Sequence, residues 1–260
     1  MPGLKGYRFS VVWLLAVAAA AGCSARVPAP ATTRAVPVAV PQKAPCPPVV
    51  LLTAFEPFAG LETNTSWEVA KRLAGERVAG HEIVVVGLPV VWERARAKLG
   101  EAVKQHEPEA AISMGVGWSG YIEVERVARN ARGPHKDNRG LLPPAREVEP
   151  GGPAEIETRL PTTQIVERLK ELGLPVRPSD SAGKYLCNEA FYSVLRATGD
   201  GTPAGFIHLP RAGPDRARRP TRSEMEAGPV AVEGLARGIR AAIEDALGAR
   251  QMSPQSSARQ

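Results

Sequence analysis

The feature that most constrains the fold is an alternation of short apolar strands and amphipathic helices from residue 48 to residue 249. Apolar and β-branched runs predict strands near 49–55, 81–90, 110–116, 121–127, 174–177 and 204–209. Apolar stripes of helical period predict helices near 64–75, 92–106, 161–172, 186–197 and 229–247. This order predicts one α/β domain with a mostly parallel sheet, whose functional groups gather beyond the carboxyl ends of the strands.

The N-terminus has the pattern of a bacterial lipoprotein signal. Lys5 and Arg8 precede the apolar run Val11–Ala21, which is shorter than the roughly 20 residues that span a bilayer. Ala20-Ala21-Gly22-Cys23 then resembles a lipobox. We expect residues 1–22 to be a lipoprotein signal peptide and Cys23 to be lipidated; an ordinary cleaved signal or an uncleaved anchor is the alternative.

The segment that follows Cys23 has the composition of a tether. Residues 23–47 are rich in Pro, Ala and Val and predict an extended linker, and residues 250–260 predict a disordered tail. The expected location is the bacterial cell envelope, with the lipid anchor holding the domain on the periplasmic side of a membrane. Ser24 gives no retention signal for the inner membrane, which favours the outer membrane.

The basic balance of the chain lies outside the predicted domain. The net charge is +6, but residues 1–47 hold five basic and no acidic residues, and the tail adds Arg250 and Arg259. The remaining 26 basic residues nearly balance the 27 acidic ones. Charge therefore gives no argument for nucleic-acid binding. Clustered arginines between Arg211 and Arg222 predict a solvated loop rather than an anion site.

Of the three cysteines, Cys187 is the candidate nucleophile. Cys23 is assigned to lipidation, and Cys46 lies in the tether without a scaffold. Cys187 is expected at the start of a helix, where the helix dipole favours the thiolate. A buried, inert cysteine is an equally good interpretation of this local sequence.

Four histidines and two neighbouring glutamates are candidates for the base and its partner. His208 ends an apolar strand, and His135 lies in a predicted loop as the second candidate base. His81 and His106 are expected at the surface. Glu123 and Glu125 share one face of a predicted strand, and spacing does not choose between them.

The motifs predict neither a metal nor a cofactor. The chain has no HExxH or CxxC pattern, so no metal ligands are assigned. Gly115–Gly120 contains GxGxxG, but it precedes a predicted strand rather than a helix, and Trp118 would crowd a pyrophosphate. We therefore reject dinucleotide binding.

From Val49 to about Leu247 the chain resembles the pyroglutamyl-peptidase I family, also called pyrrolidone-carboxylate peptidases. Five ordered motifs carry the resemblance: TAFEPFAG at 53–60 with Asn64 and Ser66-Trp67, LPVV at 88–91, ERVARN at 125–130, SAG with YLCN at 181–188, and GFIHLP at 205–210.

The resemblance implies roles that the residues alone left open. It implies Cys187 as nucleophile, His208 as base and Glu125 as the carboxylate that orients the imidazole. It also implies a single three-layer α/β/α sandwich with a twisted, mostly parallel sheet, a substrate peptide with N-terminal pyroglutamate, and no cofactor. Phe55 and Phe58 are expected against the pyroglutamyl ring, with ordinary core packing as their alternative.

Departures from the family pattern keep two alternatives open. Ala59 replaces a glycine, Asp180 replaces a common asparagine, and the loops at 115–125 and 130–137 look shortened. A related cysteine amidase or peptidase with another N-terminal specificity is the first alternative. The second is a non-catalytic binding lipoprotein, in which Cys46 and Cys187 form a disulfide. A homo-oligomer is a further candidate assembly.

Overall fold

The computed structural model describes residues 47–58, 62–212 and 221–252. The predicted signal peptide, Cys23, Cys46 and the end of the tail lie outside these described residues. The strands are β1 (Val49–Phe55), β2 (Arg77–Val78), β3 (His81–Leu88), β4 (Ala110–Val116), β5 (Ile122–Glu125), β6 (Val127–Arg129), β7 (Glu155–Glu157), β8 (Val176–Ser179) and β9 (Ala204–Leu209). The helices are α1 (Thr65–Leu73), α2 (Arg94–His106), α3 (Thr162–Glu171), α4 (Leu186–Ala197), α5 (Arg222–Ala227) and α6 (Val232–Met252).

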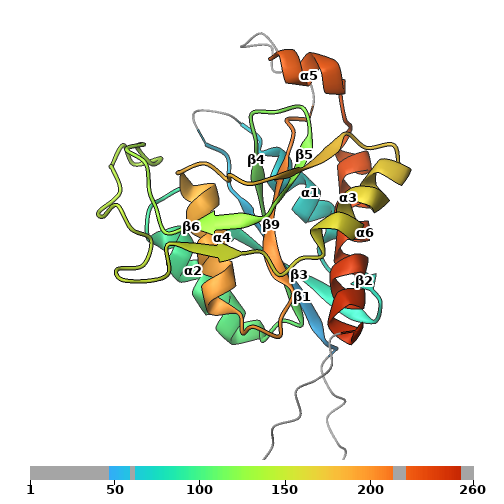
Figure 1. The fold of residues 1–260 in the computed structure, drawn as a ribbon, viewed down its shortest axis with the longest axis horizontal. Helices are drawn as coiled ribbons and strands as arrows, with labels where there is room; N and C mark the ends of the chain where they lie inside the picture. The colour runs from blue at the N-terminus through green and yellow to red at the C-terminus, as the bar shows by residue number, and fades with distance from the viewer. Residues whose placement is uncertain (1–46, 59–61, 213–220, 253–260) are drawn as a thin grey trace, which may run out of the picture. The chain divides into compact units, whose positions relative to one another are not determined.

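A seven-stranded, mostly parallel sheet organises these elements (Figure 1). The strand order is β2-β3-β1-β4-β9-β5-β8, with β6 and β7 forming a separate two-stranded sheet. The strands β3, β1, β4 and β9 pair in parallel, so their carboxyl ends meet at one edge. The predicted fold class, a three-layer α/β sandwich, is therefore confirmed.

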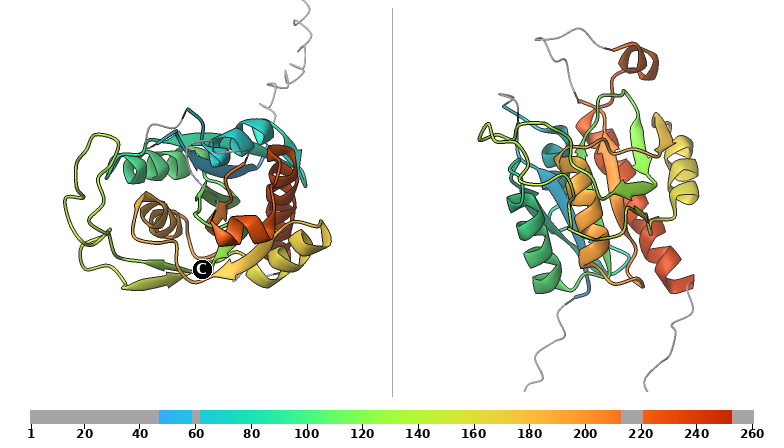
Figure 2. Two further views of the ribbon diagram at one scale, coloured as in Figure 1. Left: turned by 90° about the horizontal axis from the view of Figure 1, so that it is seen from above. Right: turned by 60° about the vertical axis from the view of Figure 1, so that its left-hand side comes forward.

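The two faces of the sheet are covered by different helices (Figures 1 and 2). Helices α1, α3 and α6 pack on one face with Val50, Leu52 and Ala54 of β1. Helices α2 and α4 pack on the other face, with Leu51 and Phe55 of the same strand. Successive side chains of a strand point to opposite faces, so the continuous apolar run of β1 supplies both cores.

The strand predicted over 121–127 is interrupted at Arg126. β5 ends at Glu125, pairs antiparallel with β9 and parallel with β8, and belongs to the main sheet. β6 begins at Val127 and pairs instead with β7. β5 and its parallel neighbour β8 both run opposite to β9, and this reversal brings the start of β5 beside the end of β9.

Two further expectations need correction. His81 is buried rather than at the surface, because its ring contacts the Ala79 carbonyl and lies 3.1 Å from the Glu109 carboxylate. Helix α2 begins at Arg94 instead of Trp92, since Glu93 has a φ of 61° that a helix does not accept.

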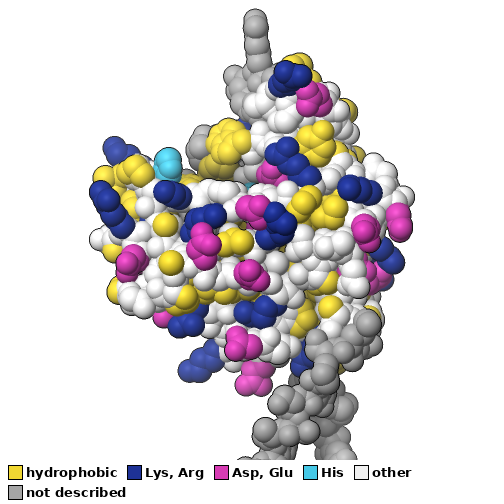
Figure 3. Space-filling model, viewed as in Figure 1, with side chains coloured by type: hydrophobic (Ala, Val, Ile, Leu, Met, Phe, Trp, Pro, Cys, Tyr) yellow, Lys and Arg dark blue, Asp and Glu magenta, His cyan; other side chains and the backbone are white. Residues whose placement is uncertain are grey.

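Two features bear on partners larger than a peptide: the distribution of charge on the surface and the apolarity of the helices. Basic and acidic side chains are interspersed over the described residues on the face in Figure 3. Among the described residues, no helix combines the length and apolarity that crossing a membrane requires.

Gly205 in β9 tests how tightly the sheet packs. A Cβ at this position would lie 2.3 Å from Thr158 Oγ1 and 2.7 Å from Leu160 Cδ1. We expect Gly205→Ala to lower the free energy of unfolding by about 1–3 kcal/mol, because the added methyl group overpacks a buried strand. Urea unfolding followed by tryptophan fluorescence measures this loss. Gly199→Ala, whose Cβ meets nothing within 4 Å, is the matched control; equal midpoints for the two variants would contradict the expectation.

Candidate active site

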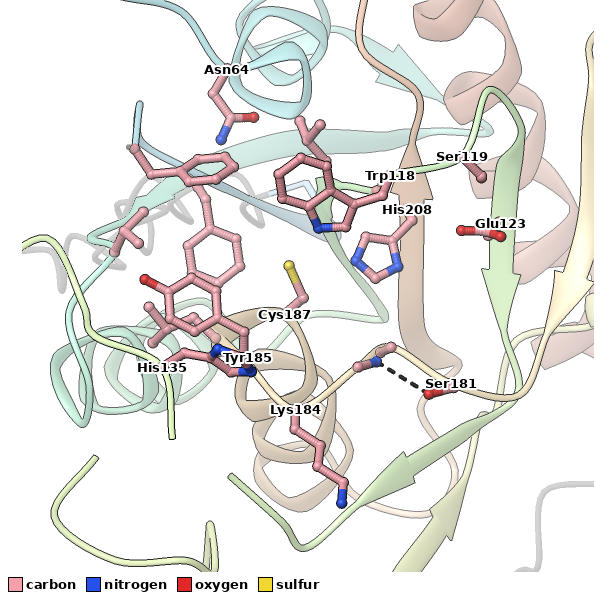
Figure 4. A pocket seen from close by; sticks show the side chains of 18 of the residues that line it. Asn64, Trp118, Ser119, Glu123, His135, Ser181, Lys184, Tyr185, Cys187 and His208 are labelled. Carbon is pink, nitrogen blue, oxygen red and sulfur yellow. Dashed lines mark hydrogen bonds between the residues drawn. The ribbon is translucent and has the colours of Figure 1, made fainter. Parts of the chain in front are cut away.

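A cavity of about 730 Å³ opens beside the carboxyl ends of β1, β4 and β9. Residues from the seven-stranded sheet, from the start of α4 and from the loops line it, among them Phe55, Phe58, Asn64, Val90, Trp118, Ser119, Glu123, His135, Arg177, Tyr185, Cys187 and His208. In Figure 4, the Cys187 sulfur lies between an aromatic group containing Tyr185 and the imidazole of His208. The predicted nucleophile and base therefore share one cavity.

Cys187 lies in the first turn of α4, one residue after the helix begins at Leu186. Its side chain is partly exposed, and its free thiol lines the cavity. The backbone N–H groups at a helix N-terminus stabilise an anion there. Gly115 at the end of β4 makes room for the sulfur, since a Cβ at Gly115 would lie 2.7 Å from Cys187 Sγ.

His208 lies near the end of β9, between the other two members of the predicted triad. Its Nδ1 is 2.7 Å from Glu125 Oε1, and the Cys187 side chain is its second electrostatic partner. Burial by itself would lower the pKa of the imidazole, but the Cys187 thiolate and the Glu125 carboxylate outweigh burial and raise the pKa to about 10. The protonated imidazolium is therefore the favoured form of His208 at neutral pH.

Glu125 is fully buried at the end of β5, and the antiparallel pairing of β5 with β9 places it beside His208. Its Oε1 carries the bond to the imidazole, while its Oε2 has no hydrogen-bond partner among the described residues. Glu123 instead bonds with Arg177. His135, the second candidate base, lies at the exposed end of the cavity, with its ring edge-on to Tyr185.

Phe55 and Phe58 both line the cavity, as predicted. Phe55 is 3% exposed and belongs to the α2–α4 core, and Phe58 packs against that core from a half-buried position. Tyr185 adds a third aromatic wall: its hydroxyl donates to the Lys136 carbonyl, and burial raises its pKa to about 12. The aromatic side of the cavity is therefore neutral and largely apolar.

The sequence reasoning missed a buried ion pair that connects the loop 130–154 to α4. Arg132 and Glu189 are both fully or almost fully buried, with Arg132 Nε 2.5 Å from Glu189 Oε2. Arg132 also contacts Glu93, just before α2. Burial raises the pKa of Glu189, and the charge of Arg132 opposes that rise. Glu189 lies two residues after Cys187, so its pairing links the nucleophile helix to the wall of the cavity.

Asn188 makes a second connection of this kind. Its side-chain oxygen accepts from the Arg129 backbone N–H, and its side-chain nitrogen donates to the carbonyls of Arg129 and Ala131. The available signal was a run of three polar or ionisable residues, Cys187 to Glu189, at the start of a helix whose other buried residues are mostly apolar.

Glu123, Glu125 and His208 also form a group whose ligand atoms all lie within 4.8 Å of one another. Such spacing can hold a metal ion. Here one oxygen of each carboxylate already has a partner, because Arg177 binds Glu123 Oε1 and His208 binds Glu125 Oε1. The group is accounted for by these two ion pairs.

Gly115 provides a test of the thiol's position that needs no substrate. We expect Gly115→Ala to slow alkylation of Cys187 by iodoacetamide at neutral pH by about tenfold, because displacing the sulfur from His208 lowers the thiolate fraction. Mass spectrometry of the Cys187 peptide measures the rate. Gly100→Ala in α2, whose Cβ meets nothing within 4 Å, is the control; unchanged alkylation in Gly115→Ala would show that the sulfur tolerates the methyl group.

Comparisons with known proteins agree with this arrangement. The family model for pyroglutamyl peptidase matches residues 49–249. Pyrrolidone-carboxylate peptidase of Gloeobacter violaceus is 43% identical over 183 residues, covering 68% of this chain and 88% of the relative. The Klebsiella pneumoniae protein of the same name is 37% identical over 208 residues, covering 76% of this chain and 96% of the relative.

Solved structures show the same fold. Pyroglutamyl peptidase I of Bacillus amyloliquefaciens matches with a TM-score of 0.69 at 34% identity, covering 77% of this chain and 97% of that one. Pyrrolidone carboxyl peptidase of Thermus thermophilus matches with a TM-score of 0.68 at 35% identity, covering 76% of this chain and 100% of that one. The chain therefore belongs to the pyroglutamyl peptidases, cysteine peptidases that remove N-terminal pyroglutamate from peptides.

Proposed function

We propose that Cys187, His208 and Glu125 are the catalytic residues with which this chain removes N-terminal pyroglutamate. The observation that carries the proposal is the place of the His208 ring, whose Nδ1 lies 2.7 Å from the Glu125 carboxylate and which shares one cavity with the Cys187 sulfur. This is the geometry of a nucleophile, its base and a third group that orients the base.

The chemistry follows from the charge state of the pair. The Cys187 thiolate attacks the carbonyl carbon that joins pyroglutamate to the next residue. Backbone N–H groups in the first turn of α4 stabilise the oxyanion, since the helix leaves them without internal partners. His208 then gives its proton to the departing amine, and a thioester joins the pyroglutamyl group to Cys187.

Water completes the cycle. Neutral His208 takes a proton from a water molecule, the resulting hydroxide attacks the thioester, and the thiolate leaves as free pyroglutamate forms. Glu125 holds Nδ1 throughout and so directs Nε2 of His208 toward the reacting atoms. Its negative charge also stabilises the imidazolium that forms when the water is deprotonated.

The aromatic side of the cavity suits the pyroglutamyl ring. Phe55, Phe58 and Tyr185 offer apolar surface in the cavity. Tyr185 lies on the side of Cys187 away from His208 (Figure 4). A neutral lactam has an apolar ring edge and one amide, which a mostly apolar pocket with a few polar groups accommodates. In this arrangement the leaving peptide lies on the His208 side.

The triad predicts graded losses of activity. We expect Cys187→Ala to abolish hydrolysis of a pyroglutamyl aryl amide, and Glu125→Gln to lower kcat by about 10²–10⁴-fold with a smaller change in KM, because the glutamine keeps the shape but not the charge. Steady-state kinetics at neutral pH measures both. Cys46→Ser is the control thiol variant and should stay active. Activity that survived Cys187→Ala would sink the proposal.

We further propose that the chain is lipid-anchored through Cys23 in a bacterial cell envelope, with the tether 24–47 holding the domain on the periplasmic side. The support is the tripartite signal pattern and the small-residue sequence before Cys23. Lipidation should appear as incorporation of an alkyne-tagged fatty acid into the full chain during bacterial growth, and as partition of the protein into the membrane fraction. Cys23→Ala should lose both, whereas Cys46→Ala should keep both. Equal labelling of wild type and Cys23→Ala would rule out this anchor.

A further inference from the structure

A second carboxylate, Glu123, lies beside the imidazole of His208. The pairing of β5 with β9 sets Glu123 directly opposite His208, and Glu123, Glu125 and His208 have ligand atoms within 4.8 Å of one another. A Cβ at Gly117 would lie 3.3 Å from both Glu123 Oε2 and His208 Cβ, so this glycine leaves the space between the two side chains open. The mechanism above does not use Glu123.

Arg177 holds Glu123 from the next strand. In the parallel pairing of β5 with β8, Arg177 is the partner of Glu123. Its Nε and Nη2 lie 3.0 and 2.5 Å from Glu123 Oε1, and its guanidinium covers the Tyr121 ring at 5.0 Å. Three adjacent strands therefore carry a row in register: Arg177, Glu123 and His208. The row continues to Gly115, which touches the sulfur of Cys187.

Arg177 occupies only one of the two carboxylate oxygens of Glu123. Both bonds from Arg177 end on Oε1, and Oε2 has no hydrogen bond to any residue that the structure describes. The Glu123 side chain is only 15% exposed, compared with 48% for Arg177. The negative charge is thus closer to the imidazole and less exposed to water than the positive charge that balances it.

The other groups around His208 do not duplicate this pair. Glu125 contacts the ring from β5, and Cys187 contacts it from α4. Gly115 in β4 and Gly117 just after it add no side chain beside the imidazole. β9 contributes the uncharged ring of Phe206, whose centroid lies 4.8 Å from that of His208. Arg211, past the end of β9, places its guanidinium over the Trp118 ring. Glu123 and Arg177 are therefore the charged groups in register with the imidazole whose roles are unassigned.

We propose that Glu123 and Arg177 form an outer ion pair that sets how firmly His208 holds its proton. Glu123 stabilises the imidazolium through space, and Arg177 limits that stabilisation by drawing the carboxylate charge away. Both are positioning residues, since they act through His208 and touch no reacting atom. The inference rests on the proposed role of His208, because a general acid must hold its proton in the resting enzyme and release it to the leaving amine.

Opposite charges at the two positions predict opposite shifts. Glu123→Gln removes a negative charge near His208, so the alkaline limb of the pH profile of kcat/KM should move down by about half to one pH unit. Arg177→Gln leaves the carboxylate unbalanced, so the same limb should move up by about half a unit. The double variant should lie between the two single variants. A merely structural role would lower activity in both variants without moving the limb in opposite directions.

The matched control is another arginine–glutamate pair joined by two hydrogen bonds. Arg196 Nε and Nη2 bind the Glu149 carboxylate at 2.8 and 2.9 Å, the arginine is likewise 48% exposed, and neither residue lines the cavity. Glu149→Gln and Arg196→Gln make the same changes in net charge and should leave the alkaline limb within about 0.2 pH units, since solvent screens charges this far away.

A direct titration separates this inference from the proposed catalytic role. The chain has four histidines, so NMR can follow each imidazole, with His208 assigned by its loss in His208→Asn. The His208 titration should shift down in Glu123→Gln and up in Arg177→Gln, whether or not His208 is catalytic. Shifts of the same sign, or shifts no larger than in the control pair, overturn the inference. If these shifts appear but His208→Asn hydrolyses substrate normally, the catalytic assignment fails and the outer ion pair stands.

Discussion

The buried bond between Glu125 and His208 is the interaction on which the site depends. A carboxylate with no exposed surface is strongly destabilised unless it has a partner, and the imidazolium is the charged partner that the fold supplies to it. The bond also explains why the sheet is not entirely parallel. β5 must run against β9 to bring its carboxylates level with the end of β9, and a slip of one residue would turn both carboxylates to the opposite face.

The cavity wall depends on a second buried charge pair. The loop 130–154 contains neither helix nor strand and projects at the left of Figure 1. Arg132 anchors it to Glu189, and Asn188 makes three hydrogen bonds to the backbone of Arg129 and Ala131, where β6 leads into the loop. Breaking a buried pair leaves an uncompensated charge, so the loop is fixed where it meets the nucleophile helix. Helix α4 therefore sets the position of the thiol and also of the part of the cavity wall that His135 and Lys136 form beside Tyr185.

The sequence predicted those features that local patterns determine. Apolar runs marked β1, β3, β4 and β9. The helix expected near 64–75 is α1, which Asn64 caps by accepting a hydrogen bond from the Ser66 N–H. Periodicity also marked α3 and α4 within one or two residues. These patterns bury or cap side chains within one element, so a single chain segment carries the whole signal.

Features that depend on pairing between distant segments were not predicted. The alternation of 121–127 reads as one strand, and only the competition of β9 and β7 for the backbone on each side of Arg126 divides it. The choice of Glu125 over Glu123 came from the family resemblance, because both face the same way. Arg132 and Glu189 are 57 residues apart, and neither has a local pattern that names the other.

The site has a buried part, where Glu125 orients the imidazole of His208, and an open part, which carries the thiol of Cys187. Both follow from positions on the sheet. His208 and Glu125 lie under the helices, where low polarity strengthens their attraction, whereas Cys187 is partly exposed at the mouth of α4. In the proposed mechanism, the Cys187 thiolate must be accessible to a substrate carbonyl. Burial shields the charge state of the His208 imidazole from the solvent. Gly115, near the end of β4, and Gly117, just after it, carry no side chains. The sulfur of Cys187 and the imidazole of His208 can therefore both approach the backbone at this level. In our inference, the row of Arg177, Glu123 and His208 across β8, β5 and β9 is how charge outside the core affects the pair of His208 and Cys187.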